Sequence, residues 1–280
     1  MRRWQQLMVV LLFVGSTLHS QMPLALEAND SCEAQWEDLS KEYVHQSPSA
    51  DYGAALRAWK GLESTCDNSP RYRARLALIY FYLDQPKASK EALATVSREE
   101  EEGEPLVTLV RILADAALLR ESGASQGELE EIEERLRAYA LKNPRDAVGV
   151  TLLGDVLNDL GRYEAAAQAY VAVIKAMGMS ARSVGVMRNL TITYEQMARH
   201  EDAYRLAGEV ISYDRAGLTS DLYFMCAVAR AQASLGRVKG ARDTLTLLAN
   251  KNAEVREHPD FKAAVAFVKE KMRTTAVPVE

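Results

Sequence analysis

Apolar and polar residues alternate along most of this chain with the period of an α-helix. After residue 30 the chain divides into amphipathic segments of helical length, in which apolar residues recur at i, i+3, i+4 and i+7, and short polar breaks separate them. The breaks recur about twice in every 37 residues. Ala and Leu dominate the apolar set, and long stretches lack clusters of β-branched residues. The pattern predicts an all-α protein with almost no sheet.

The helical segments repeat along the chain. Residues 152–174 align with residues 189–211 at an offset of 37, and a third copy follows at an offset of 38, with Ala241 beneath Ala203. Each copy has two amphipathic stretches joined by a turn, which is Leu160-Gly161-Arg162 in the first copy. A glycine just past the last apolar position takes the left-handed conformation that ends a helix, and a small Ala lets two antiparallel helices approach closely. Each copy is therefore predicted to be a helical hairpin.

The three copies share a set of residues at fixed intervals. The first has Leu153-Gly154, Leu157, Ala166, Tyr170 and Val173, the second has Leu190-Thr191, Tyr194, Ala203 and Ala207, and the third has Val228-Ala229, Gly236, Ala241 and Leu245. This set resembles the tetratricopeptide repeat (TPR) family, whose signature couples a Leu-Gly pair in the first helix to an Ala and an aromatic residue in the second. The resemblance is strong over residues 147–250 and weak elsewhere, and the offsets of 37 and 38 exceed the family's usual 34.

Weaker copies of the pattern are expected on both sides of residues 147–250. Upstream, residues 32–97 are predicted to form two N-terminal hairpins, and residues 105–144 a third. Downstream, residues 257–273 are predicted to be one amphipathic helix that caps the open end of the array. The expected fold class, as the resemblance implies, is an all-α, right-handed α-solenoid of about six hairpins with a C-terminal capping helix.

Residues 1–28 have the order of a secretory signal peptide. Two arginines precede an apolar run from Leu7 to Val14, and small and polar residues follow. The run is shorter than the roughly 20 residues that span a bilayer as a helix. We expect cleavage after Ser20 or Ala28, with retention as an uncleaved membrane anchor as the alternative. The protein is therefore expected in the periplasm or another extracytoplasmic space, or else secreted.

The chain has three cysteines, Cys32, Cys66 and Cys226. In an oxidising compartment Cys32 and Cys66 are expected to form a disulfide that ties the first helix to the end of the second. The alternative is that Cys32 stays unpaired on a frayed terminus. Cys226 lies within an apolar helical segment and is expected to be a small core residue rather than a nucleophile.

Charge argues against a nucleic-acid partner. The formal net charge is −5, and the lysines and arginines are not gathered on one segment as phosphate-backbone binding requires. The one concentrated charge run, REEEEGE at residues 98–104, separates two predicted hairpins. It is expected to be a solvated loop between repeats, and the alternative is an acidic handle for a basic partner.

The sequence lacks the common catalytic and metal-binding motifs. There is no HExxH, CxxC, GxSxG or phosphate-binding glycine loop, and the histidines are too scattered to form a zinc pair. The acids of residues 128–134 are expected on the solvated side of a helix whose other face carries Leu129, Ile132 and Leu136. We therefore expect no enzymatic activity, no catalytic residue, no metal and no cofactor.

The TPR resemblance implies that the first helices of the hairpins line a concave groove that binds a peptide or helix of another protein. The positions that match the family's groove residues are Thr151, Asp155, Asn158, Arg188, Asn189, Ile192, Glu195, Tyr223 and Arg230. Their mixed charge favours a polar segment over a free carboxylate terminus. Two functions stay open: an adaptor or scaffold in a cell-envelope assembly, and a structural subunit that self-associates or packs permanently in an envelope complex.

Overall fold

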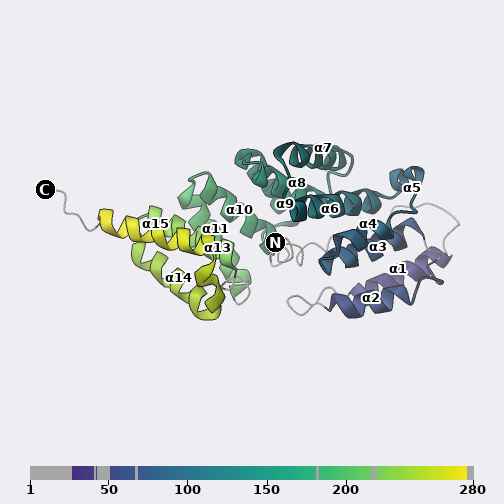
Figure 1. Ribbon diagram of the computed structural model, residues 1–280, viewed down its shortest axis with the longest axis horizontal. Helices are drawn as coiled ribbons and strands as arrows, with labels where there is room; N and C mark the ends of the chain where they lie inside the picture. Colours follow the sequence, from purple (N-terminus) through teal and green to yellow (C-terminus); the bar gives the residue numbers. More distant parts are fainter. Residues whose placement is uncertain are drawn as a thin grey trace. The chain divides into compact units, whose positions relative to one another are not determined.

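The computed structural model describes residues 27–40, 42, 51–66, 69–180, 183–215, 219 and 221–275. Within these ranges the regular structure is helical, without a strand (Figure 1). The chain divides into two compact units, Met1–Val156 (unit 1) and Leu157–Glu280 (unit 2). The predicted signal segment lies outside the described residues except for positions 27 and 28, which begin the first helix.

Unit 1 is a series of helices that pack mainly on their neighbours along the chain. They are α1 (Glu27–Leu39), α2 (Tyr52–Lys60), α3 (Pro70–Tyr82), α4 (Pro86–Ala92), α5 (Arg98–Gly103), α6 (Pro105–Ser122), α7 (Gln126–Lys142) and α8 (Ala147–Asp159), the last of which crosses the unit boundary. α3 packs on α2, α4 and α6, and α6 packs on α7. Contacts between successive hairpins are the pattern of a helical repeat protein.

Unit 2 continues the same pattern. Its helices are α9 (Tyr163–Met177), α10 (Val184–Gln196), α11 (His200–Tyr213), α13 (Leu222–Ser234), α14 (Val238–Lys251), the 3-10 helix η4 (Ala253–Glu257) and α15 (Pro259–Thr275). α10 packs on α9, α11 and α13, and α15 packs on α13 and α14 (Figure 1). Unit 1 thus contains the hairpins α1/α2, α3/α4 and α6/α7, and unit 2 contains α10/α11 and α13/α14, followed by the helix α15. This all-α repeat architecture confirms the predicted fold class.

One turn geometry recurs at the ends of four helices. The second residue after the helix has a positive φ at Asp84 (59°), Gly161 (71°), Ala198 (57°) and Gly236 (74°). In each case the next amide reaches back five residues to a helical carbonyl, as from Arg162 N to Leu157 O at 2.8 Å. This left-handed ending satisfies carbonyls that the last helical turn leaves open. The turns at Gly161 and Gly236 were predicted from their glycines, and Asp84 and Ala198 adopt the same conformation without one.

The second helices α9, α11 and α14 each carry an alanine at their fourth position. Ala166, Ala203 and Ala241 are all completely buried, as predicted. Among the first helices, α10 is buried at every residue from Val184 to Thr193. Cys226 is buried in the core of unit 2, which confirms its predicted place.

The predicted Cys32–Cys66 disulfide is present. It joins α1 to the segment after α2, with the two Cα atoms 5.2 Å apart. The two cysteines belong to a core with Trp59 and Tyr72, whose rings stack at 5.1 Å.

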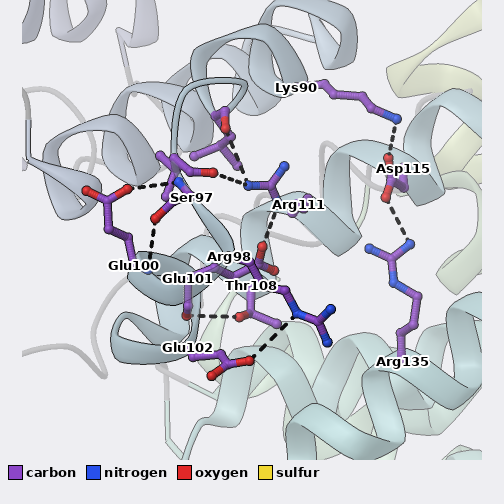
Figure 2. Close-up of polar contacts among 12 residues, drawn as sticks. Lys90, Ser97, Arg98, Glu100, Glu101, Glu102, Thr108, Arg111, Asp115 and Arg135 are labelled. Carbon is purple, nitrogen blue, oxygen red and sulfur yellow. Dashed lines mark hydrogen bonds and ion pairs between the residues drawn. The ribbon is translucent and has the colours of Figure 1, made fainter.

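The acidic run at residues 98–104 is a short helix, α5, and not the expected loop. Ser97 and Glu100 form a reciprocal capping box in which the Ser97 hydroxyl accepts from the Glu100 amide (Figure 2). Glu101 is paired with Arg111 of α6 at 3.0 Å, and Thr108 donates to the Glu101 carbonyl. A cap and two tethers to α6 outweigh the mutual repulsion of the glutamates.

The α7 acids are also only partly on the solvated side. Ile132 and Leu136 are buried as predicted, but Glu133 is buried with them at 7% exposure. It accepts from Arg137 Nε at 2.9 Å, one helical turn on. Arg137 thus supplies Glu133 with a hydrogen-bond donor of the kind that a buried carboxylate needs.

Candidate functional site

The groove residues expected from the family resemblance lie on three first helices. α8 carries Thr151, Asp155 and Asn158, α10 carries Arg188, Asn189, Ile192 and Glu195, and α13 carries Tyr223 and Arg230. Thr151 and Asp155 belong to unit 1, and the others belong to unit 2. Five of the nine, Thr151, Asp155, Arg188, Asn189 and Ile192, are buried, and the other four are half-buried.

Arg188 forms an ion pair with Asp221, the residue that caps the N-terminus of α13. The Asp221 carboxylate also accepts from the Phe224 amide at 3.0 Å, as an N-cap does. The remaining nitrogens of the guanidinium contact Asn189 Oδ1 at 3.3 and 3.4 Å. The side chains of Arg188 and Asp221 are 6% and 5% exposed, so the ion pair is buried. Arg188 therefore fastens α10 to the start of α13.

Glu195 and Arg230 form a second link between the same helices. Arg230 Nε and Nη2 each donate to one carboxylate oxygen of Glu195 at 2.8 Å, which is the two-pronged geometry that suits a guanidinium. Burial by itself disfavours the charged guanidinium, but the hydrogen bonds and charge of Glu195 outweigh it and raise the pKa of Arg230. Arg230 is therefore charged in the folded protein.

Two uncharged contacts extend the row in both directions. Thr193 Oγ1 donates to Asn158 Oδ1 at 3.3 Å, which joins α10 to the end of α8. Tyr223 meets His258 edge to face with ring centroids 5.8 Å apart, which joins α13 to the segment before α15. We call the set Asn158, Arg188, Asn189, Thr193, Glu195, Asp221, Tyr223 and Arg230 the first-helix row of unit 2.

The structure thus brings together the predicted residues of unit 2, mainly by bonding them to one another. Sequence reasoning placed Arg188, Glu195 and Arg230 as groove charges, and it missed Asp221, the partner of Arg188, and Thr193, the partner of Asn158. A signal for them exists, since the linked residues lie 33 to 35 positions apart, close to one repeat. Residues that occupy equivalent places in adjacent repeats are the natural candidates for such links.

The row contains no arrangement that indicates metal or acid-base chemistry. Among the described residues there is no group of three or more His, Cys, Asp or Glu side chains placed to hold a metal ion. Burial raises the pKa of the Cys226 thiol to about 12, so it is a thiol rather than a thiolate nucleophile at neutral pH. No helix in the described part of the chain combines the length and apolarity needed to cross a membrane.

Comparison with known proteins gives fold relatives only. No protein-family model matches the chain, and no curated protein matches it. Among solved structures it is similar to the C-terminal part of a TPR repeat-containing protein from Cytophaga hutchinsonii, with 13% identity, a TM-score of 0.48 and 89% of each chain covered. It is also similar to PilF of Pseudomonas aeruginosa, with 16% identity, a TM-score of 0.41 and coverage of 90% of this chain and 96% of that one.

A third similar structure is the TPR2AB domain of yeast Sti1 in its pHSP90 complex. The identity is 14% and the TM-score is 0.36, with 87% of this chain and 98% of that one covered.

Proposed function

We propose that this protein is a scaffold that binds a peptide or helical segment of another protein along the first-helix row of unit 2. The observation that carries the proposal is the polar character of an enclosed helix. α10 is buried from Val184 to Thr193, yet Arg188, Asn189, Thr191 and Thr193 stand among these positions. A helix that served packing alone would carry apolar residues at such places, because each buried polar group must be supplied with hydrogen bonds.

The links within the row support a binding role through preorganisation. Asp221 orients Arg188, and Glu195 orients Arg230, so the guanidinium groups are held in one geometry before any partner arrives. Side chains that are already ordered lose less conformational entropy when a partner binds. The polar row therefore favours a partner segment that itself carries hydrogen-bonding and mixed-charge side chains.

The proposed location is a cell-envelope compartment. The N-terminal signal pattern indicates export, and the Cys32–Cys66 disulfide is of the kind that persists in oxidising compartments. We propose a periplasmic or other extracytoplasmic adaptor, in contact with the membrane only through an uncleaved signal, and with a protein partner and no nucleic acid.

Photo-crosslinking from two matched tyrosines tests the proposal. Tyr223 lies on the row, whereas Tyr213 is 41% exposed on the second helix α11. Each is replaced separately by a photoreactive phenylalanine analogue in the native host, which preserves an aromatic side chain. We expect a discrete crosslinked partner from position 223 and none from position 213. Crosslinks from position 213 alone, or from neither, would contradict binding along the row.

The mass of the crosslinked product separates the two functional classes. A heterologous partner supports the adaptor, whereas a product of twice the chain mass indicates the self-associating structural subunit. Arg188→Glu is a poor probe of binding, since it would set a second carboxylate against buried Asp221. Any loss of partner in that variant would report unfolding.

A further inference from the structure

α1 is poorly suited to hold its place by itself. Its 13 residues include five carboxylates, at positions 27, 30, 33, 37 and 38, and no basic residue. Two of the acids, Glu37 and Asp38, lie at the C-terminal end, where the helix dipole disfavours negative charge. Isolated helices of this length are marginal in water. The position of α1 therefore depends on its contacts with α2 and α3.

Those contacts converge on one arginine. Arg75 of α3 is only 6% exposed, and its guanidinium lies 4.8 Å from the Trp36 ring centroid and 5.9 Å from that of Trp59. Glu33 accepts from Arg75 Nη2 at 2.6 Å and lies 3.6 Å from Arg71. α1 thus supplies the carboxylate of Glu33 and, three residues later, the indole of Trp36. The site that receives them offers the guanidinium groups of Arg71 and Arg75 and the ring of Trp59.

The receiving side of this site is held together without α1. Trp59 Nε1 donates to the Tyr72 carbonyl at 3.1 Å, and the Tyr72 hydroxyl donates to the Trp59 carbonyl at 3.3 Å. Arg71 is also paired with Glu104 at 2.8 Å. Removing α1 would therefore uncover a preformed cation–aromatic site on α2 and α3, and would leave Arg75 without its carboxylate.

The disulfide determines whether α1 can leave. Cys32 is one residue before Glu33, and its bond to Cys66 ties α1 to the segment that follows α2. With the bond intact, the site and its occupant are joined at high effective concentration, which excludes a competing segment. With the bond reduced, α1 is retained by the Glu33 and Trp36 contacts, by the apolar core that it shares with α2 and α3, and by its chain connection to α2.

We propose that α1 is a disulfide-locked occupant of the cation–aromatic site formed by Trp59, Arg71 and Arg75. Reduction opens this site to an acidic helix of another protein that carries a carboxylate and an aromatic residue three positions later. The reductant is a dithiol: it gives two electrons and two protons to the Cys32–Cys66 bond, yields two thiols, and becomes a disulfide itself. The site is separate from the first-helix row.

Hydrogen exchange and peptide binding on the full-length protein test this proposal. The probe is a fluorescent peptide of residues 27–40 with Cys32→Ser. We expect α1 amides to exchange faster after reduction, and the peptide to bind the Cys32→Ser/Cys66→Ser variant on the order of tenfold more tightly than the oxidised protein. Adding Trp36→Ala to that variant weakens the internal occupant only, and should raise peptide affinity further.

Two controls make the result specific. Cys226→Ser leaves the disulfide intact and should behave as the oxidised wild type, and a peptide carrying Glu33→Gln and Trp36→Ala should not bind. The proposal is overturned if α1 amides are equally protected in oxidised and reduced protein. It is also overturned if the peptide binds oxidised protein as tightly as the variant without the disulfide.

Discussion

Glu195 of α10 accepts two hydrogen bonds of 2.8 Å from the guanidinium of Arg230 of α13, which lies 35 positions later in the sequence. The side chains are 9% and 19% exposed, so water and salt screen the pair only weakly. We expect Glu195→Gln and Arg230→Gln each to lower the free energy of unfolding by about 1.5–3 kcal/mol, because each leaves a charged, largely buried partner. A double-mutant cycle by urea denaturation should give a coupling above about 1 kcal/mol.

The exposed pair Asp202 and Arg205 is the control for that cycle. The Arg205 side chain is 77% exposed, and the coupling with Asp202 should be about 0.5 kcal/mol or less. Equal coupling free energies for the two pairs would show that burial does not strengthen the interaction between Glu195 and Arg230.

Ala198 and Gly161 occupy equivalent turns with φ angles of 57° and 71°. A side chain is strained in this left-handed region, so Ala198→Gly should raise the free energy of unfolding by about 0.5–1 kcal/mol. Gly161→Ala should lower it by about 1 kcal/mol, although no atom lies within 4 Å of the added Cβ. Thermal denaturation of both variants checks the opposite signs, and shifts of the same sign would refute the backbone explanation.

Gly149 of α8 is required by the Tyr139 ring. A Cβ at position 149 would lie 2.4 and 2.6 Å from two ring carbons, and the ring is held in place by the hydrogen bond from the Tyr139 hydroxyl to Asp146. Gly149→Ala should therefore destabilise unit 1 by about 1–3 kcal/mol through overpacking. Gly208→Ala in α11, where nothing lies within 4 Å, should instead stabilise by up to about 1 kcal/mol in the same urea titration. If Gly149→Ala and Gly208→Ala destabilised the protein by similar amounts, the cause would be the replacement of a helical glycine in general and not the contact with Tyr139.

Asp115 of α6 lies between Lys90 and Arg135, at 2.8 and 2.9 Å (Figure 2). Burial favours the neutral acid, but hydrogen bonds and charge from the two bases outweigh it and lower the pKa of Asp115. The pKa of Asp115 is therefore lower in the folded protein than in the unfolded chain, where it is about 3.9. The ionised Asp115 contributes its full stabilisation at pH values above the unfolded pKa, and this contribution is lost as the pH falls through the folded pKa. Asp115→Asn should flatten this part of the acid denaturation curve. An unchanged slope below about pH 4 would contradict the assignment.

Cys226 should resist alkylation until the protein unfolds. Burial raises the pKa of its thiol to about 12, so the native thiolate fraction at pH 8 is about a thousandfold below that of an exposed cysteine. Iodoacetamide labelling of the oxidised protein should therefore report one thiol, at the rate of global unfolding. The Cys226→Ser variant should take up no label, and rapid native labelling of the wild type would show that the α13 core opens locally.

The local sequence was sufficient to predict the hairpins. Amphipathic spacing, the glycines at positions 161 and 236 and the alanines at positions 166, 203 and 241 each act within one or two helices. Their effects on backbone conformation and on the approach of two helices depend on neighbours a few residues away. The Cys32–Cys66 pair was also predictable, because two cysteines near the ends of one hairpin leave few other pairings.

The partners of the charged side chains were decided only by tertiary packing. Arg188 and Arg230 were expected to face a ligand, and in unit 2 they pair with Asp221 and Glu195, one repeat away. Glu101, expected in a solvated loop, pairs with Arg111. The periodic spacing of apolar residues indicates which face of a helix is apolar. Which polar atoms come within 3 Å of each other depends on how successive hairpins are positioned against one another, that is, on their register. That register depends on the shape of all the packed side chains together, which no short stretch of the sequence contains.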